Sequence, residues 1–420
     1  MTGASKTGGS EDWMEFSRYF INGRTFAAPD AGLQHGLARA YCTEERPRCM
    51  CVPGGVEMYI AKHTEYVVKR MPDSGRKHHP TCPSFEAESG TSGLGDLVGE
   101  AIIEHSPDKI ELQTNFPISR MLGTSMPRGE ATSATARAHL SNKRMSLGAV
   151  LHFLYERAGF NRWYPAMEGR RHQGVLHKYL TEAARGVVLK GAALDERLYV
   201  PEPFRAEIKD EIAERRRRKL AMLLSPEDAV KFEMAIVVGE YKGCEPAASG
   251  RRIVIKHMPD VPLHIESQAW EDVVRRDGSL LRARDANLAR KLRIVMAALI
   301  YAVRENVYQV DRLSMMLATD QWIPLEGLGE LALVEALQRE RRAFMKPLKY
   351  DARTAAGFPN VLLLDCGKAP LPLHVVSSLT KPKERAHKEK AIATSGASEW
   401  VWHTDGEMPA LPERARRVAG

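Results

Sequence analysis

Three cysteines and a histidine near the N-terminus have the residue types and the spacing of a zinc site. One residue separates Cys49 from Cys51, and two residues separate His79 from Cys82. Thiolate sulfur and imidazole nitrogen are common ligands of tetrahedral zinc in proteins. We therefore predict a structural zinc ion held by Cys49, Cys51, His79 and Cys82. His79 is preferred over His78 because it keeps the two-residue gap to Cys82.

The segment between these ligand pairs is typical of a β-hairpin. Two β-prone runs, Val56–Ala61 and Tyr66–Met71, would return the chain and bring the two pairs together. A disulfide is the alternative for these cysteines, but no signal peptide is recognisable and the remaining cysteines are scattered. We therefore expect a reduced, cytoplasmic chain.

Length and composition indicate a soluble protein with real cores. A chain of 420 residues with 44% hydrophobic content is long enough for two or three domains. The apolar run from Val295 to Val303 is much shorter than the about 20 apolar residues that cross a bilayer. We expect no contact with a membrane.

The chain is basic, and its cations are clustered. It has 61 Lys and Arg against 53 Asp and Glu, and the net charge of +8 favours an anionic partner such as DNA or another nucleic acid. The clusters occupy residues 215–219, 339–349 and 381–390. Each cluster has a second interpretation as the solvated face of a helix.

The order of predicted elements gives a multidomain α+β fold. After a disordered start at 1–12, residues up to 92 form the zinc-binding hairpin module. Residues 93–145 form a second hairpin and a flexible linker. Residues 146–225 are predicted to be helical, and residues 226–420 to form a mixed α/β domain.

The helical segment is compatible with a DNA-binding winged helix. Apolar residues at helical spacing from Leu147 to Leu154, a second helix near Val175–Leu180 and a strand at Arg197–Val200 suit that motif. Its phosphate-facing residues would be Arg170, Arg171 and Lys178. The alternative is a helical spacer whose small core is closed by Trp163 and Tyr164.

The C-terminal elements look similar to the core of PD-(D/E)xK nucleases. The sequence predicts a helix from Leu331 to about Met345, strands near Val361–Leu364 and Leu371–Val376, a basic helix from Lys381 to Ile392 and a strand around Trp400–Trp402. In those enzymes two strand-borne acids and a lysine hold magnesium beside a phosphate. The likeness therefore implies a restriction-endonuclease-like domain, with magnesium if it is catalytic.

The strand positions of this nuclease-like site lack their acidic residues. Asn360 stands where an aspartate is expected, and His374 stands near the second acid position. Asp365 is the remaining acidic candidate, with Glu335 on the preceding helix as a helper. Asp365 also suits the start of a turn. We therefore predict a catalytic site that is lost or weakened.

A second catalytic candidate is an acid-x-lysine pair after an apolar strand. Glu240 and Lys242 follow the run Met234–Val238. The upstream Asp228 lies in a predicted helix start and does not supply a strand-borne acid. Because such triplets are also common on surfaces, the pair has an ordinary structural interpretation as well.

Several short motifs extend the likeness beyond the zinc segment. They are Leu151–Tyr155 with Ala158–Trp163, then Trp322–Pro324, and Arg341–Asp351. Together with the cysteine and histidine segment they resemble the bacterial domain-of-unknown-function family 1173. The resemblance implies a protein of plasmids and integrative mobile elements, and it carries no established activity. Similar proteins look closer to Pro-Asp followed by an acid on the C-terminal strands.

We expect a zinc-containing nucleic-acid-binding protein without strong nuclease activity. Its phosphate contacts would come from the second basic cluster, namely Arg341, Arg342, Lys346 and Lys349. Two alternatives stay open. An active magnesium-dependent nuclease would use Asp365, or Glu240 with Lys242, and a protein-interaction scaffold would use the zinc module without nucleic acid.

Overall fold

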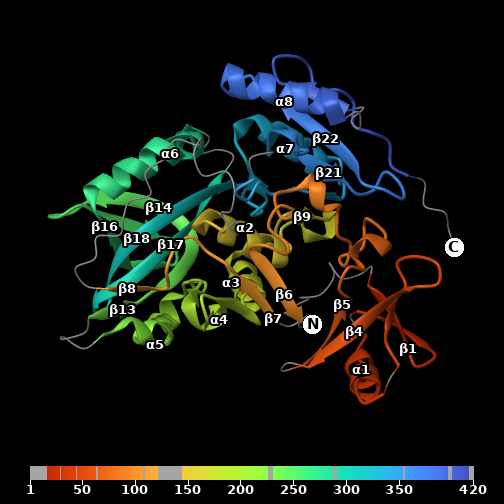
Figure 1. The fold of residues 1–420 in the computed structure, drawn as a ribbon, viewed down its shortest axis with the longest axis horizontal. Helices are drawn as coiled ribbons and strands as arrows, with labels where there is room; N and C mark the ends of the chain where they lie inside the picture. Colours follow the sequence, from red (N-terminus) through yellow and green to blue (C-terminus); the bar gives the residue numbers. More distant parts are fainter. Residues whose placement is uncertain are drawn as a thin grey trace, which may run out of the picture.

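The computed structural model describes residues 17–415 apart from 29, 44, 63–64, 107–108, 122–143, 226–229, 287–290, 353–354 and 396–399. Within these residues the fold is mixed α+β, with eight α-helices and several sheets (Figure 1). The predictions for the start at 1–12, for the linker over 122–143 and for a helix start at Asp228 lie outside the described residues. No helix in the described ranges is long and apolar enough to span a bilayer.

The N-terminal unit is a five-stranded sheet with one helix against it. Its strand order is β2-β1-β3-β4-β5. The bounds are β1 Arg18–Ile21, β2 Arg24–Ala27, β3 Arg48–Cys49, β4 Val56–Lys62 and β5 Tyr66–Arg70. Asn22 and Gly23 turn the chain between β1 and β2 with φ of 48° and 77°, which these residue types tolerate. Helix α1, Leu33–Tyr41, turns its buried side chains toward this sheet.

The segment after the zinc module packs against the C-terminal half of the chain. Residues 86–95 are rich in Gly, Ser and Glu, which is typical of a linker, and contain one short 3-10 helix, Ser89–Thr91. The Gly93 N–H donates to the Leu348 carbonyl at 2.9 Å. A Cβ on Gly93 would lie 2.1 Å from the Lys349 carbonyl oxygen. Glycine is therefore required here by close backbone approach.

The central unit joins a four-stranded sheet to two helices. The sheet order is β11-β10-β7-β6. The bounds are β6 Ile102–Ser106, β7 Lys109–Leu112, α2 Leu147–Arg157, α3 Gln173–Ala183, β10 Val187–Leu189, β11 Ala192–Ala193, α4 Leu194–Arg197, β12 Leu198–Tyr199 and α5 Lys209–Leu220. The Ser146 hydroxyl caps α2 by accepting from the Ala149 N–H. Strand β12 pairs with a neighbouring barrel, so the predicted Arg197–Val200 strand belongs to that barrel sheet.

Five long strands close into a barrel. The bounds are β14 Ala235–Pro246, β15 Arg251–Ile255, β16 Met258–Ile265, α6 Ser267–Ala286, β17 Arg293–Arg304 and β18 Val307–Ala318. The pairings run β14–β15, β15–β16, β16–β18, β18–β17 and β17–β14, and only β16–β18 is parallel. Numbered within the barrel, the order is 1-2-3-5-4-1 with a helix between the third and fourth strands. This is the architecture of an OB-fold.

The two walls of the barrel have different surroundings. On the β14–β17 wall, outward residues such as Ile236, Val238 and Val295 are buried in the core of the central unit. Inward residues such as Val237 and Met296 belong to the barrel interior. Because strands alternate their side chains, this wall is apolar on both faces. The β15–β16 wall keeps half-buried and exposed residues on its outer face.

Flanking strands complete the barrel region and a separate C-terminal sheet follows it. Strand β13, Lys231–Glu233, pairs with β8, Ser119–Met121, and β19, Pro324–Leu325, pairs with β18. The C-terminal sheet has the order β23-β22-β21-β20-β9. Residues 226–420, predicted as one mixed domain, therefore contribute to three distinct sheets.

The C-terminal elements follow the predicted series. The bounds are α7 Leu331–Arg339, β20 Phe344–Met345, β21 Val361–Leu363, β22 Leu371–Val376, α8 Pro382–Ser395 and β23 Trp400–His403. Helix α7 ends before the predicted Met345, and Arg341 has a φ of 54°, which is incompatible with continuing the helix. The remaining edge strand, β9 Arg162–Trp163, comes from the central segment and pairs with β20.

Candidate zinc centre and neighbouring cleft

The N-terminal sheet carries the cysteines of the candidate zinc centre. Cys49 ends β3, where it pairs with Tyr19 of β1 and Val56 of β4. Gly54 and Gly55 have φ of 80° and 68° and return the chain from Cys51 into β4. The second pair of ligands follows the hairpin β4–β5 and a 3-10 turn, Gly75–Lys77. The predicted hairpin thus brings the two halves of the site together.

Four side chains converge to a metal-sized group. The ligand atoms of Cys49, Cys51, His78 and Cys82 all lie within 4.8 Å of one another. The Cys49 and Cys82 sulfurs are 3.7 Å apart, and His78 Nδ1 is 3.3 Å from the Cys51 sulfur and 3.6 Å from the Cys82 sulfur. Tetrahedral zinc with these ligands requires separations of roughly 3.5–3.8 Å. The residues therefore fit zinc.

The histidine of this group is His78, not the predicted His79. His79 Nδ1 instead contacts the Thr81 hydroxyl at 2.8 Å. The His79 backbone N–H lies 3.4 Å from the Cys51 sulfur, and the Ser84 N–H lies 3.4 Å from the Cys82 sulfur. His79 therefore supports the site through its backbone, because N–H groups stabilise thiolate charge.

The thiols of the cluster perturb one another when no cation is present. Hydrogen bonding from Cys49 lowers the pKa of Cys51. Hydrogen bonding to Cys51 and to Cys82, followed by burial, raises the pKa of Cys49. A zinc ion bound by these four side chains would supply positive charge that stabilises their thiolates, and it would act structurally because no position is left open for substrate.

An arginine connects the zinc loop to the C-terminal sheet. Arg162 on β9 donates from Nη1 to the Pro83 carbonyl at 2.8 Å and from Nη2 to the Phe85 carbonyl at 2.5 Å. Pro83 directly follows the ligand Cys82. The position of the zinc loop is thus fixed relative to the rest of the chain.

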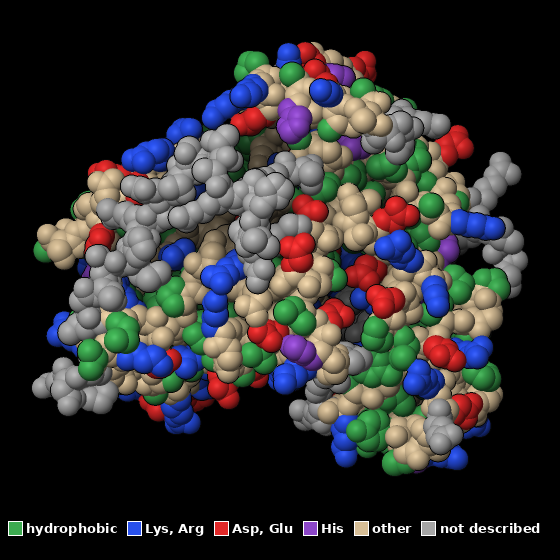
Figure 2. Space-filling model, in the orientation of Figure 1, with side chains coloured by type: hydrophobic (Ala, Val, Ile, Leu, Met, Phe, Trp, Pro, Cys, Tyr) green, Lys and Arg blue, Asp and Glu red, His purple; other side chains and the backbone are tan. Residues whose placement is uncertain are grey.

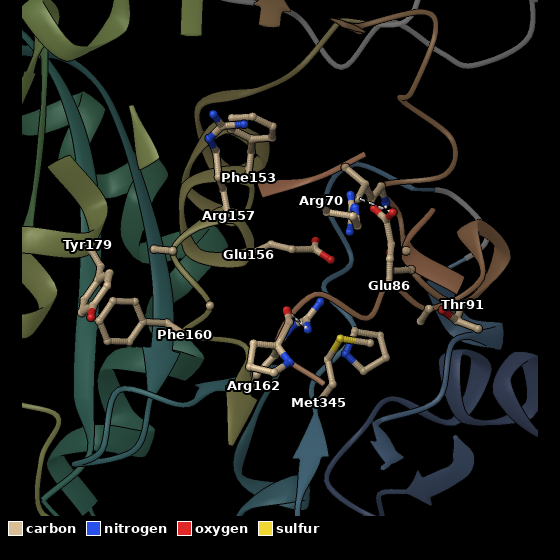
Figure 3. A pocket seen from close by; sticks show the side chains of 18 of the residues that line it. Arg70, Glu86, Thr91, Phe153, Glu156, Arg157, Phe160, Arg162, Tyr179 and Met345 are labelled. Atoms are coloured by element: carbon tan, nitrogen blue, oxygen red, sulfur yellow. Dashed lines mark hydrogen bonds and ion pairs between the residues drawn. The ribbon is translucent and has the colours of Figure 1, made fainter. Parts of the chain in front are cut away.

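A cleft of about 1360 Å³ lies beside this connection. Its walls come from the zinc unit, from α2 and α3, and from the segment around Tyr350. Its cationic lining residues are Arg70, Arg76, Arg157, Arg162, Arg170, Arg171 and Lys178, and its acidic ones are Asp73, Glu86, Glu88, Glu104 and Glu156. Figure 3 shows Glu156 pointing toward Arg70 and Glu86, with Arg162 nearby.

The side chains in the inner part of the cleft are paired with one another. The Tyr350 hydroxyl donates to Glu156 at 2.6 Å, and Arg70 lies 2.9 Å from Glu86. Burial raises the pKa of Glu156, against the effect of the Tyr350 hydrogen bond. These pairs connect the walls of the cleft. Exposed Arg170 and Lys178, near helix α3, lie at its surface.

The predicted phosphate-contacting residues of the helical segment have different environments. Arg170 and exposed Lys178 line the cleft. Arg171 is buried, donates to the Phe160 and Gly159 carbonyls, and burial lowers its pKa to about 9. Arg171 therefore has a structural role, and the prediction that it faces phosphate does not fit its position.

The second basic cluster is largely paired inside the protein. Arg342 is 3% exposed and forms an ion pair with Asp365 at 2.9 Å. Lys346 is 1% exposed and lies 2.7 Å from Glu330. Two further pairs are Arg341 with Glu168 at 3.3 Å and Lys349 with Glu326 at 2.7 Å. Arg342 and Lys346 therefore cannot contact phosphate from these positions.

The first basic cluster, residues 215–219 on α5, is also engaged. Arg216 is buried and pairs with Asp260, Arg215 pairs with Glu202, and Lys219 donates to the Asp195 carbonyl. Arg217 and Arg218 both pair with Glu214. Figure 2 shows the same mixture on the visible face, where basic and acidic side chains are interspersed.

The predicted catalytic residues lie on β14, on α7 and after β21, and Glu240 and Asp365 already have partners. The Asp365 carboxylate accepts from Arg342 and from the Ala343 N–H at 3.1 Å. Glu240 on β14 pairs with Arg293 at 2.7 Å and Lys256 at 3.2 Å. Lys242 is exposed on the same strand, and Glu335 is half-buried on α7. Among the described residues, only the cysteine and histidine cluster brings three or more His, Cys, Asp or Glu side chains to the spacing of a metal site.

A buried polar network occupies the nuclease-like strands. Lys346 Nζ contacts Glu330 and, at 2.5 Å, the Asn360 carbonyl, while the Asn360 side chain donates to Glu330. Lys388 of α8 donates to Asn360 Oδ1 at 2.5 Å. Burial lowers the pKa of His374 on the next strand to about 4, so His374 is neutral at pH 7. Sequence analysis identified Asn360 and His374 but missed Glu330, because no local pattern links it to Lys346.

Substituting Cys49 tests the zinc centre. We expect Cys49→Ser to reduce bound zinc from about one ion per chain to nearly none and to unfold the N-terminal sheet, because structural zinc contributes folding free energy. Metal content by mass spectrometry and thermal unfolding measure both effects. The exposed Cys42 offers the matched control, Cys42→Ser. Full zinc content and unchanged melting in Cys49→Ser would contradict the assignment.

The choice between adjacent histidines has its own test. We expect His78→Ala to weaken zinc binding strongly, whereas His79→Ala keeps most of it because His79 contacts the cluster through its backbone. Competition with a chromogenic chelator gives the two affinities. Equal or larger loss in His79→Ala would show that His79 is the ligand.

The buried lysine gives a stability prediction. Lys346→Met leaves the Glu330 carboxylate buried without its ion pair, and we expect a loss of about 3–5 kcal/mol in the free energy of unfolding. Lys349→Met removes a half-exposed partner of Glu326 and should cost less than about 1 kcal/mol. Urea unfolding monitored by tryptophan fluorescence compares them, and equal losses would refute the distinction.

Comparison with known proteins confirms the resemblance to family 1173. The family model described as "Protein of unknown function (DUF1173)" matches residues 19–405. No curated protein and no solved structure matches the chain significantly. Because the match spans nearly the whole length, the chain belongs to the DUF1173 family of proteins of unknown function.

Proposed function

We propose that this protein is a zinc-stabilised nucleic-acid-binding protein without strong nuclease activity. The barrel carries the proposal, because the OB-fold architecture binds oligonucleotides on the face of its second and third strands. Those strands here are β15 and β16, and their outer face is half-buried to exposed rather than packed into a core. A fold alone does not fix a function, so the charge distribution has to agree.

The surface charges are compatible with nucleic-acid binding, but the available cations differ from those that the sequence predicted. Much of the first two basic clusters is paired with acids, so phosphate contacts would come from other exposed cations. Exposed Arg170 and Lys178 line the cleft, and exposed Arg252, whose pair with Glu245 is open to solvent, lies on the β15–β16 wall. Contacts between such cations and phosphates weaken with salt.

The nuclease alternative receives less support. Asp365 and Glu240 are each neutralised by arginine, and a divalent cation would have to displace these partners. Lys346 and Lys388 add positive charge beside Asn360, where an aspartate would be needed. The zinc centre is closed, with four protein ligands, and so suits structure rather than catalysis.

Binding and cleavage can be measured on the same samples. Zinc-loaded protein is mixed with fluorescein-labelled single-stranded and duplex oligonucleotides, with and without magnesium or manganese. We expect an anisotropy increase that weakens roughly tenfold from 50 to 200 mM salt, and no cleavage on denaturing gels. Metal-dependent cutting would favour the nuclease. Failure to bind any oligonucleotide at low salt would favour the protein-interaction scaffold.

A further inference from the structure

We infer that the open barrel wall binds a single-stranded nucleic acid across its strands, on a row of four side chains. The row consists of Arg252 on β15, His264 on β16, Gln309 on β18 and Tyr301 on β17. This inference rests on the proposed function and names its binding surface and its substrate class.

Strand register places the four residues side by side. Arg252 is paired with His264, His264 with Gln309, and Gln309 with Tyr301. With neighbouring strands about 4.8 Å apart, the row is roughly 14 Å long. It therefore crosses the strands and continues from one pairing to the next without interruption.

The side chains of the row point away from the barrel interior. Their chain neighbours Ile253, Leu263, Tyr308 and Ile300 are all buried in the barrel core. Successive residues of a strand project to opposite faces, so the row lies on the outer surface. The Arg252 side chain is 44% exposed, and the other three residues are half-buried.

The chemistry of the row suits unpaired nucleotides. The half-buried His264 ring offers a stacking surface, and every base has a face that can stack. The Tyr301 ring is packed against Phe232, with ring centroids 6.1 Å apart, and so contributes its hydroxyl and ring edge. Gln309 can donate to and accept from base edges. Arg120 of β8 lies over the Tyr301 ring at 5.0 Å and donates to its hydroxyl at 3.1 Å, so a guanidinium stands at this end of the row.

Three acidic groups face the same surface and set the electrostatic balance. Glu245 lies 3.5 Å from Arg252, Asp311 lies 3.6 Å from Arg120, and Glu266 interacts with Tyr301. The Arg252–Glu245 pair is solvent-exposed on both sides, and such pairs contribute little. A phosphate can therefore compete for Arg252, and the exposed Arg304 at the end of β17 adds a further cation.

The row favours single strands over duplexes because stacking needs an exposed base face. Stacking on His264 requires a base face that a duplex keeps buried. The row extends from Arg252, beside the β14–β15 loop, toward Tyr301, near the β17–β18 turn. These two connections flank the ligand face in OB-folds.

Variants of the row test the inference in the full-length, zinc-loaded protein. The double variant Arg252→Ala/His264→Ala should raise the Kd for a labelled 12-nucleotide single strand at least tenfold and leave zinc content and melting temperature unchanged. Arg252→Glu, at an exposed site, should weaken binding further without affecting the core. Arg275→Ala on α6 is the matched control, because Arg275 is a 73% exposed arginine outside the strands of the row, and it should stay within twofold.

The outcomes separate this inference from the proposed function. Unchanged single-strand binding by both row variants would overturn the inference and leave nucleic-acid binding elsewhere, for example through Arg170 and Lys178 in the cleft. Absence of binding by the unmodified protein would overturn both. Binding of a neutral oligosaccharide in place of the oligonucleotide would also overturn the inference and assign the wall to another ligand.

Discussion

Packing of one barrel wall into two cores is the constraint on which much of this structure depends. Strands β14 and β17 are twelve residues long and pair from Ala235 to Glu240 of β14 and from Val295 to Ile300 of β17. In this paired part, inward side chains fill the barrel, and outward side chains fill the core of the central unit beneath α2. Because the paired part is buried on both sides, the nucleic-acid contacts proposed here fall on the opposite wall and on Tyr301, which follows the pairing. The same packing explains why residues Val295–Ile300 are apolar without alternation.

Local sequence patterns were enough to predict three of the four residues of the cysteine and histidine cluster and several strands. The hairpin β4–β5, the Asn22-Gly23 turn and strands β21 to β23 lie where residue types predict them. The choice of His79 failed because adjacent side chains point in different directions, and which one faces the sulfurs depends on the turn at Gly75–Lys77. Residue spacing alone does not specify that turn.

Non-local pairing could not be predicted in the same way. The parallel contact of β16 with β18 closes the barrel only after a twenty-residue helix and another strand have intervened. The basic clusters were misjudged for a related reason, since their acidic partners lie far away in the chain. Asp260 faces Arg216, and Glu330 faces Lys346, across turns of the fold that composition does not reveal. Charge clustering in sequence therefore overestimated the charge available to a ligand.

The position of β9 affects how the chain can fold. Trp163 pairs with Phe344, so the C-terminal sheet acquires its last strand from a segment synthesised well before the rest of that sheet. Arg162 in the same strand also holds the carbonyls that follow Cys82. The β9 segment therefore cannot pair with β20 until Phe344 has been synthesised. Pairing between segments so far apart in the sequence slows folding.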